Sequence, residues 1–111
     1  MDAKHRLVVI ESPLKGDMAM NKKYARACMR DCLMRGEYPF ASHLLYAQEG
    51  ILDDTIPAER KLGMEAGFAW EEFADATVVY VDLGISAGME KGLQKAKEAG
   101  RPAEFRQLKN W

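Results

Sequence analysis

The sequence lacks the features that mark membrane, secreted and nucleic-acid-binding proteins. Its longest uninterrupted apolar run, Leu7 to Ile10, falls far short of the roughly 18 residues that a membrane span requires. Residues 1–6 are charged and hold no apolar stretch followed by a cleavage site, so no signal peptide is indicated. A formal net charge of −1, with both signs interleaved, gives no field that would attract nucleic acid. We therefore expect a cytoplasmic protein with neither nucleic-acid nor membrane partners.

Cysteine and histidine are also scarce, with two of each. Cys28 and Cys32 lie four residues apart in a segment with helical spacing, so their side chains share one face. This spacing suits a thiol pair, but two small apolar fillers in a reducing cytoplasm are the better interpretation. Neither His5 nor His43 has another His or Cys at a spacing typical of a metal site. We expect no metal and no cofactor.

The remaining composition is that of an ordinary globular protein. A length of 111 residues is near the common size of one domain and too short for two independent cores. Hydrophobic residues make up 48% of the chain and charged residues 30%, so a packed core can form. We predict a single domain over residues 1–111.

Four short segments have the pattern of β-strands. Arg6–Ile10 and Ala76–Val81 are apolar and β-branched, as expected for strands buried on both faces. Tyr38–Ala41 carries a proline, which favours an edge strand. Ala103–Leu108 is expected to complete the sheet.

Helical spacing fills the intervals between these strands. The first helix is expected from Asn21, as a candidate N-cap, to Gly36, and the second from Pro57 through Phe73. Ser86 is a plausible N-cap for a third helix that ends before Gly100. Residues 42–56 have no clear period and are expected to form a loop, and loops of this length are usually functional or disordered.

This alternation predicts a small flavodoxin-like or Rossmann-like three-layer α/β/α domain with a mainly parallel four-stranded sheet of order 2-1-3-4. In such sheets a ligand binds beyond the carboxyl ends of the strands where the strand order reverses, here between the first and third strands. The ligand-binding residues expected there are Glu11, Ser12, Pro13, Gly84, Ser86 and Gly88. The long loop adds His43, Tyr46, Gln48, Asp53 and Asp54 as candidate contacts.

Two carboxylates near the third strand are candidates for catalysis. Glu90 lies in the first turn of the third helix, where the helix dipole favours an ionised carboxylate that could attack an anomeric carbon. A glutamate there is also simply favourable at a helix start. Asp82 follows the third strand, where it is either a polar site residue or part of an Asx-type turn.

The segment Gly84-Ile-Ser-Ala-Gly-Met-Glu-Lys-Gly92, preceded by an apolar strand and by Ala74-Asp75, resembles a stretch of the nucleoside 2-deoxyribosyltransferase family. Ser12-Pro13 is similar to that family's Gly-Pro, with serine in place of glycine, and Gly100-Arg-Pro102 is similar to its Gly-Lys-Pro. The resemblance implies that Glu90 is the nucleophile that forms a covalent deoxyribosyl intermediate, and that Ser12-Pro13 helps to build the nucleobase pocket. The whole chain looks closer still to small, functionally unassigned proteins of bacteriophages and bacteria, for which the resemblance implies a fold only.

Three classes of function follow from these observations. The first is an N-glycosidic hydrolase or transferase acting on a nucleoside or nucleotide, with Glu90 as nucleophile and Asp82 or His43 assisting. The second is a non-catalytic binder that sequesters or senses a nucleotide-derived ligand in the same cleft. The third is an interaction module in which Met64, Phe68 and Trp70 form a homodimer contact, although residues at such spacing are more often core. A homodimer or a higher homo-oligomer also fits a domain whose long loop needs a neighbour to close the cleft.

Overall fold

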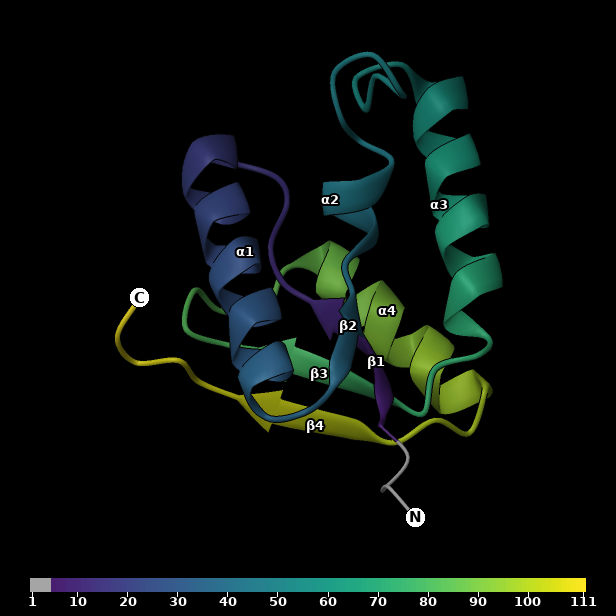
Figure 1. Cartoon of the computed structure of the whole chain (residues 1–111). Helices are drawn as coiled ribbons and strands as arrows, with labels where there is room; N and C mark the ends of the chain where they lie inside the picture. Colours follow the sequence, from purple (N-terminus) through teal and green to yellow (C-terminus); the bar gives the residue numbers. More distant parts are fainter. Residues whose placement is uncertain (1–4) are drawn as a thin grey trace.

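The computed structural model describes residues 5–111, apart from the side chains of residues 42 and 43. Its strands are β1 (Leu7–Glu11), β2 (Tyr38–Phe40), β3 (Ala76–Tyr80) and β4 (Ala103–Arg106). They form a parallel sheet in the order β2-β1-β3-β4 (Figure 1). This arrangement confirms the predicted α/β fold and strand order. The strand order reverses between the carboxyl ends of β1 and β3.

The helices lie on both faces of this sheet (Figure 1). They are α1 (Met18–Met34), α2 (Ser42–Leu45), α3 (Pro57–Glu71) and α4 (Ala87–Glu98). Helix α1 packs on β1 and β2, whereas α4 contacts β1, β3 and β4. Right-handed crossovers place α1 on one face and α3 with α4 on the other. Within the described part of the chain, no helix combines the length and apolar character needed to cross a membrane.

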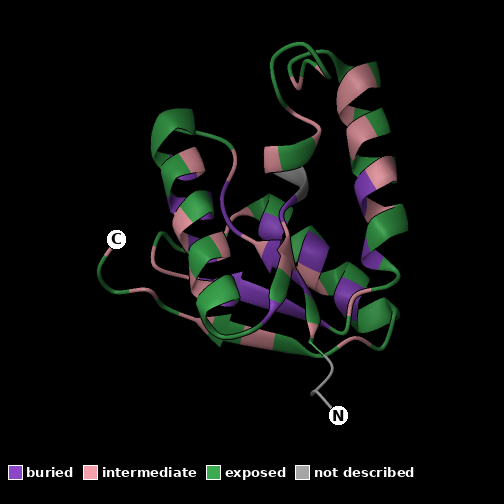
Figure 2. Ribbon diagram, in the orientation of Figure 1, coloured by how far each residue is buried: buried purple, intermediate pink, exposed green. Residues whose placement is uncertain are grey.

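The core forms where the central strands meet α1. Strand β3 is buried along its whole length, and alternate β1 and β3 side chains pack against α1 (Figure 2). Cys28 and Cys32 belong to this cluster as free, fully buried thiols, as the filler interpretation predicts. Because successive strand side chains point to opposite faces, Ile10 faces α1 and the next residue, Glu11, faces α4.

The start of α1 differs from the sequence prediction. The helix begins at Met18, and Asp17 is its N-cap because the Asp17 carboxylate accepts a hydrogen bond from the backbone N–H of Met20. Asn21 is instead buried inside the helix, and its amide donates to the carbonyls of Leu14 and Lys15. Asn21 therefore holds the segment after β1 rather than capping the helix.

Two other parts of the chain also differ from the sequence prediction. The segment expected to be a loop contains the short helix α2. Strand β4 ends at Arg106 rather than Leu108, because the backbone N–H groups of Leu108 and Lys109 donate to the carboxylate of Asp82, each with a hydrogen bond of 2.9 Å. The chain therefore leaves the sheet at this point.

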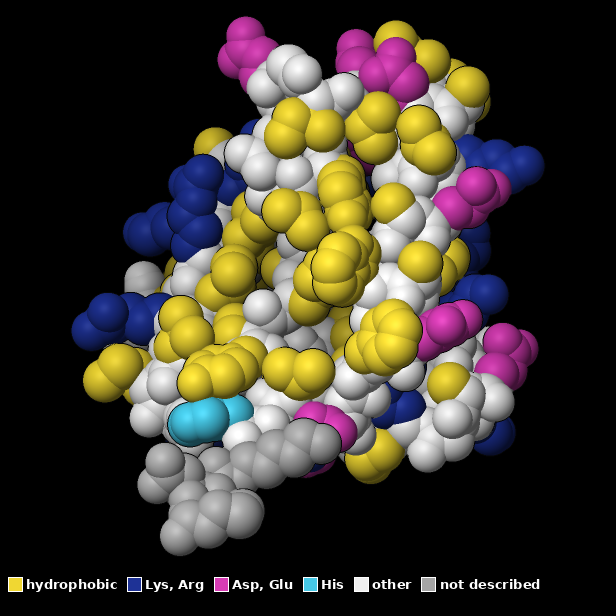
Figure 3. Space-filling view, turned by 45° about the vertical axis from the view of Figure 1, so that its right-hand side comes forward, with side chains coloured by type: hydrophobic (Ala, Val, Ile, Leu, Met, Phe, Trp, Pro, Cys, Tyr) yellow, Lys and Arg dark blue, Asp and Glu magenta, His cyan; other side chains and the backbone are white. Residues whose placement is uncertain are grey.

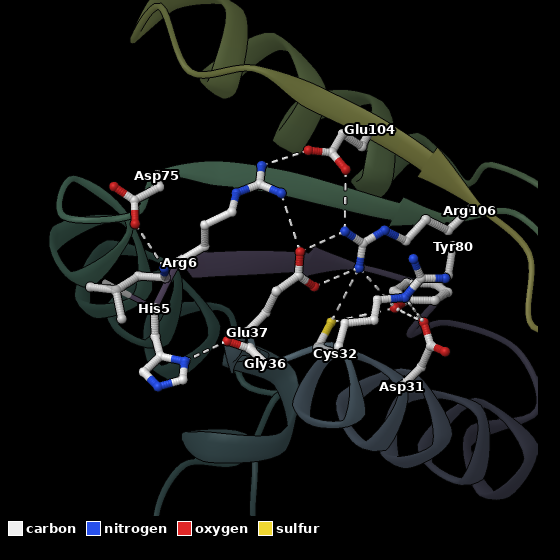
Figure 4. Close-up of polar contacts among 12 residues, drawn as sticks. His5, Arg6, Asp31, Cys32, Gly36, Glu37, Asp75, Tyr80, Glu104 and Arg106 are labelled. Carbon is white, nitrogen blue, oxygen red and sulfur yellow. Dashed lines mark hydrogen bonds and ion pairs between the residues drawn. The ribbon is translucent and has the colours of Figure 1, made fainter. Parts of the chain in front are cut away.

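A buried ion-pair network joins the two edge strands on the α1 face (Figure 4). Glu37 precedes β2 and Arg106 ends β4, and two hydrogen bonds of 2.7 Å connect the guanidinium to both carboxylate oxygens. These side chains are only 7% and 8% exposed. Glu104 accepts hydrogen bonds from Arg6 and Arg106, while Arg6 also pairs with Glu37. The hydrogen bonds from Arg106 hold the pKa of Glu37 below its ordinary value.

Candidate functional site

A cavity of about 290 Å³ opens beyond the carboxyl end of β1, between α3 and the start of α4. Its walls come from four parts of the chain: the end of β1 with the segment after it, the loop between α2 and α3, the inner face of α3, and the first turns of α4. The lining residues are Glu11, Ser12, Leu14, Lys15, Tyr46, Ala47, Leu52, Asp54, Glu59, Arg60, Gly63, Met64, Phe68, Glu71, Ser86, Ala87, Gly88, Met89, Lys91 and Gly92.

Local sequence positions the start of α4 at the edge of this cavity. Ser86 is the N-cap, as predicted, and its hydroxyl accepts a hydrogen bond of 3.2 Å from the backbone N–H of Met89. Gly84 has a positive φ of 86°, a conformation that glycine adopts readily in the turn after β3. Met89 is buried and anchors the first turn. Ser86 and Gly88 therefore lie at the cavity wall.

Glu11 reaches the cavity from the last position of β1, where it pairs with Val79 of β3. Its carboxylate packs directly against Gly92 of α4, so that a Cβ atom at Gly92 would overlap it. Glycine at this position gives the Glu11 side chain its space.

Burial controls the charge of Glu11. Removal from water and then the negative charge of Glu71 raise the pKa of Glu11 from 4.5 to about 8, although the positive charge of Arg101 opposes this shift. A carboxyl group with such a pKa is mostly protonated at pH 7. The cavity therefore contains a neutral carboxylic acid as well as charged groups.

Arg101 holds Glu71 in place beneath the cavity. Its Nε donates to the Thr77 hydroxyl of β3 over 2.9 Å, and its Nη1 donates to the backbone carbonyl of Glu71 over 3.0 Å. Its Nη2 lies 3.7 Å from the Glu71 carboxylate, and both side chains are 7% exposed. Burial still raises the pKa of Glu71 because it outweighs the positive charges of Arg101 and Lys95.

The other lining groups combine apolar and paired charged side chains. Met64 and Phe68 from α3 and Leu52 from the preceding loop provide apolar walls. Arg60 pairs with Asp54 at 3.2 Å. Such a cavity, apolar with a few convergent polar groups, is typical of a site for a small organic molecule.

Some of the residues expected at the site from sequence meet here and others do not. Glu11, Ser12, Ser86 and Gly88 line the cavity, as do Tyr46 and Asp54 from the long segment between α2 and α3. Pro13, Gln48, Asp53 and Gly84 are not among the lining residues. The Asp53 carboxylate instead accepts hydrogen bonds from the backbone N–H and the hydroxyl of Thr55. The side chain of His43 lies outside the described part of the structure.

Glu90 lies on a different side of α4 from the cavity. Gly88 and Gly92 face the cavity, and a residue two positions further along a helix from Gly88 is rotated by about 200° around its axis. The Glu90 side chain is exposed and borders a separate shallow hollow with Leu93 and Arg101. Its place in the first turn agrees with the sequence analysis, but the structure directs it away from Glu11.

The carboxylate of Asp82 holds the C-terminal segment through hydrogen bonds. It accepts hydrogen bonds from the Tyr24 hydroxyl and from the backbone N–H groups of Leu108 and Lys109. Burial acts to raise the pKa of Asp82, but these hydrogen bonds together lower it. Neither the catalytic nor the Asx-turn interpretation describes this contact, because its partners are distant in sequence.

The sequence analysis did not single out Glu71, Arg101 or Gly92 as individual site residues. One feature of the sequence could have indicated that Glu71 belongs to the site. It lies three residues after Phe68, on the inner face of α3, where a charged side chain is unexpected. The contact between Glu11 and Gly92 joins residues 81 positions apart, and nothing local in the sequence indicates it.

Comparisons with known proteins agree with the fold. The sequence model of a family described as "Domain of unknown function (DUF7768)" matches residues 6–106. No curated protein matches the chain. A solved structure of a 2-deoxyribosyltransferase from the psychrotolerant bacterium Bacillus psychrosaccharolyticus is similar, with a TM-score of 0.66 and 16% identity, over 95% of this chain and 74% of that one. At this identity the likeness shows the fold alone. The resemblance to bacteriophage proteins stays a prediction.

Proposed function

For this chain, which belongs to the DUF7768 family of domains of unknown function, we propose that the cavity beyond β1 binds a nucleoside or nucleotide. The observation that carries this proposal is the position of the cavity, at the reversal of strand order between β1 and β3. Ligands of open parallel sheets bind at this point. The similar 2-deoxyribosyltransferase structure supports a nucleoside as the class of ligand.

The lining of the cavity supports the same class. A volume of about 290 Å³ is near the lower end of the range for small-molecule sites, which is about 300–1,000 Å³. Tyr46, Met64 and Phe68 offer apolar and aromatic surface for a flat nucleobase. Ser86 and Gly88 at the start of α4 are available to the polar part of the ligand, as the positive end of a helix favours hydroxyl or phosphate oxygens.

The proposal has a catalytic and a non-catalytic form. In the catalytic form the Glu90 carboxylate attacks the anomeric carbon as the N-glycosidic bond breaks and the base leaves, with Asp82 or His43 assisting. Water or a second base then takes the sugar from Glu90. The attack requires an approach to within about 3–3.5 Å. The exposure of Glu90 on a side of α4 away from the cavity favours the second form, a binder that holds its ligand without cleaving it.

A thermal-shift screen of nucleosides, nucleotides and cyclic nucleotides tests the proposal, with released base measured by chromatography. A ligand that binds only the folded state stabilises it by about 2.7 kcal/mol at a hundred times its Kd. We expect at least one nucleoside or nucleotide to raise the Tm without release of base. Release of base by the wild-type protein that is lost in the Glu90→Gln variant would establish the catalytic form. Absence of stabilisation across the panel would contradict both forms.

We also propose that the outer face of α3 binds a second copy of the chain. Leu62, Ala66 and Trp70 recur at helical spacing on this face, and Trp70 is 60% exposed. Met64 and Phe68, which the sequence analysis placed with Trp70 in a homodimer contact, line the cavity instead. Figure 3 shows hydrophobic side chains gathered across the side that carries α3.

Size-exclusion chromatography with light scattering tests this interface. We expect a particle of twice the chain mass at tens of micromolar, and Trp70→Glu should convert it to a monomer, because the charge would be buried without a partner. Leu33→Glu is the matched control, since Leu33 is 53% exposed on α1 and should leave the dimer intact. A monomeric wild-type chain at this concentration would contradict the interface.

We also propose a cytoplasmic location and a small-molecule partner. Two buried free thiols, Cys28 and Cys32, suit a reducing compartment, so we place the protein in the cytoplasm. The formal net charge of −1 favours a small molecule over nucleic acid as partner. Immunodetection of the protein in the cytoplasmic fraction of the native cell, and its absence from the other fractions, is the direct check on location.

A further inference from the structure

Among the acidic groups that line the cavity, Glu11 alone has neither a hydrogen bond nor an ion pair with the described part of the chain. Asp54 pairs with Arg60, Glu59 accepts from the backbone N–H of Asp53, and Glu71 lies beside Arg101. No residue in the described part of the chain donates a hydrogen bond to the Glu11 carboxyl, which nevertheless lines the cavity. A carboxyl group at the cavity wall that makes no such contact is available to a ligand, which gains affinity by supplying the missing hydrogen-bond partners.

The charged groups around Glu11 come from every element that packs against it. Glu71 approaches from α3, Arg101 follows α4, and Lys91 of α4 and Lys15 after β1 line the same cavity. Arg101 is already engaged by Thr77 and Glu71 through three contacts. Burial and the negative charge of Glu71 together outweigh the positive charge of Arg101, so the pKa of Glu11 is raised to about 8.

We propose that Glu11 recognises its ligand as a neutral carboxylic acid, pairing with the amide-like edge of an uncharged nucleobase. A protonated carboxyl group presents one O–H donor beside one carbonyl acceptor. The edge of a base that carries a ring nitrogen beside an exocyclic oxygen or amino group offers the complementary acceptor and donor. This inference rests on the proposed function and specifies its ligand: a nucleoside held by an unmodified, uncharged base edge.

The binding of nucleosides at different pH values tests this pairing. The panel consists of the common 2′-deoxynucleosides and ribonucleosides, measured by titration calorimetry from about pH 6 to about pH 9.5. We expect the affinity for the best binder to be constant below pH 7 and to fall about tenfold per pH unit above pH 8, as the proton is lost. The same nucleoside methylated on its ring nitrogen at that edge should bind at least tenfold more weakly.

Two substitutions test whether Glu11 binds the ligand in its neutral or its ionised form. Glu11→Gln keeps the shape and one donor beside one acceptor, so it should bind within a few-fold of wild type with no decline above pH 8. Glu11→Leu removes both groups and should lose at least tenfold. Binding that is independent of pH in the wild type, or that is abolished by Glu11→Gln, would overturn the inference while leaving nucleoside binding established. If no nucleoside binds at any pH, the proposed function fails, and the inference with it.

Gly92→Ala gives a second test that does not alter the carboxyl group. The added Cβ overlaps the Glu11 carboxyl, which must swing away from its place, so nucleoside affinity should fall about tenfold. In a Glu11→Ala background the carboxyl is gone, and Gly92→Ala should then have no further effect on affinity. An equal loss in both backgrounds would show that Gly92 acts without Glu11.

Discussion

Replacing Arg106 with methionine is expected to lower the free energy of unfolding by about 3–5 kcal/mol, because it leaves a buried carboxylate without its main partner. Glu37 is 8% exposed and receives two hydrogen bonds of 2.7 Å from Arg106. Arg6 would remain as the only cation paired with it in the described part of the chain, at 3.2 Å and 41% exposed. Urea unfolding followed by circular dichroism measures the change.

Two control variants distinguish this network from ordinary surface charge. Arg35→Met removes the exposed pair with Asp31 on α1 and should change stability by less than about 1 kcal/mol. Arg106→Met combined with Glu37→Met removes both buried charges and should recover much of the loss. If Arg106→Met is no more destabilising than Arg35→Met, the network is not a main contributor to stability.

The second large effect is expected in the pH dependence of stability, through Glu11. Its pKa is about 8 in the folded chain against an ordinary value of 4.5. Between these values the folded state keeps a proton that the unfolded state has released. The contribution of Glu11 is therefore fully present below pH 4.5 and is lost as the pH rises toward 8, at a slope of up to about 1.4 kcal/mol per pH unit. Glu11→Gln should remove this slope.

Measurement of Tm from pH 5 to about pH 8.5 in wild type and Glu11→Gln tests the slope. We expect the two proteins to be similar at the acidic end and the variant to be the more stable at the alkaline end, because an amide does not ionise. Glu72→Gln is the matched control, since Glu72 is the exposed neighbour of Glu71 and should leave the slope unchanged. Parallel wild-type and Glu11→Gln curves would mean that Glu11 is ionised in the folded protein.

The sheet and the outline of the site follow from local sequence. The apolar runs of β1 and β3 predict central strands, Pro39 predicts an edge strand, and their alternation with helical spacing predicts the strand order that the structure shows. The same order predicts the carboxyl ends of β1 and β3 as the location of the cavity, and Glu11, Ser12, Ser86 and Gly88 line it. These predictions succeed because strand burial and crossover handedness depend on patterns of neighbouring residues.

Contacts between residues that are distant in sequence could not be predicted without the tertiary structure. Sequence alone determined the α/β fold, the Ser86 cap and the end of the sheet where the cavity lies. Only the folded chain decided that Glu11 rather than Glu90 enters the cavity, because that depends on the rotation of α4 about its axis and on the space left by Gly92. It likewise decided that Asp82 holds the C-terminal segment, since the positions of side chains around a helix and beside a distant strand are set by packing rather than by local sequence.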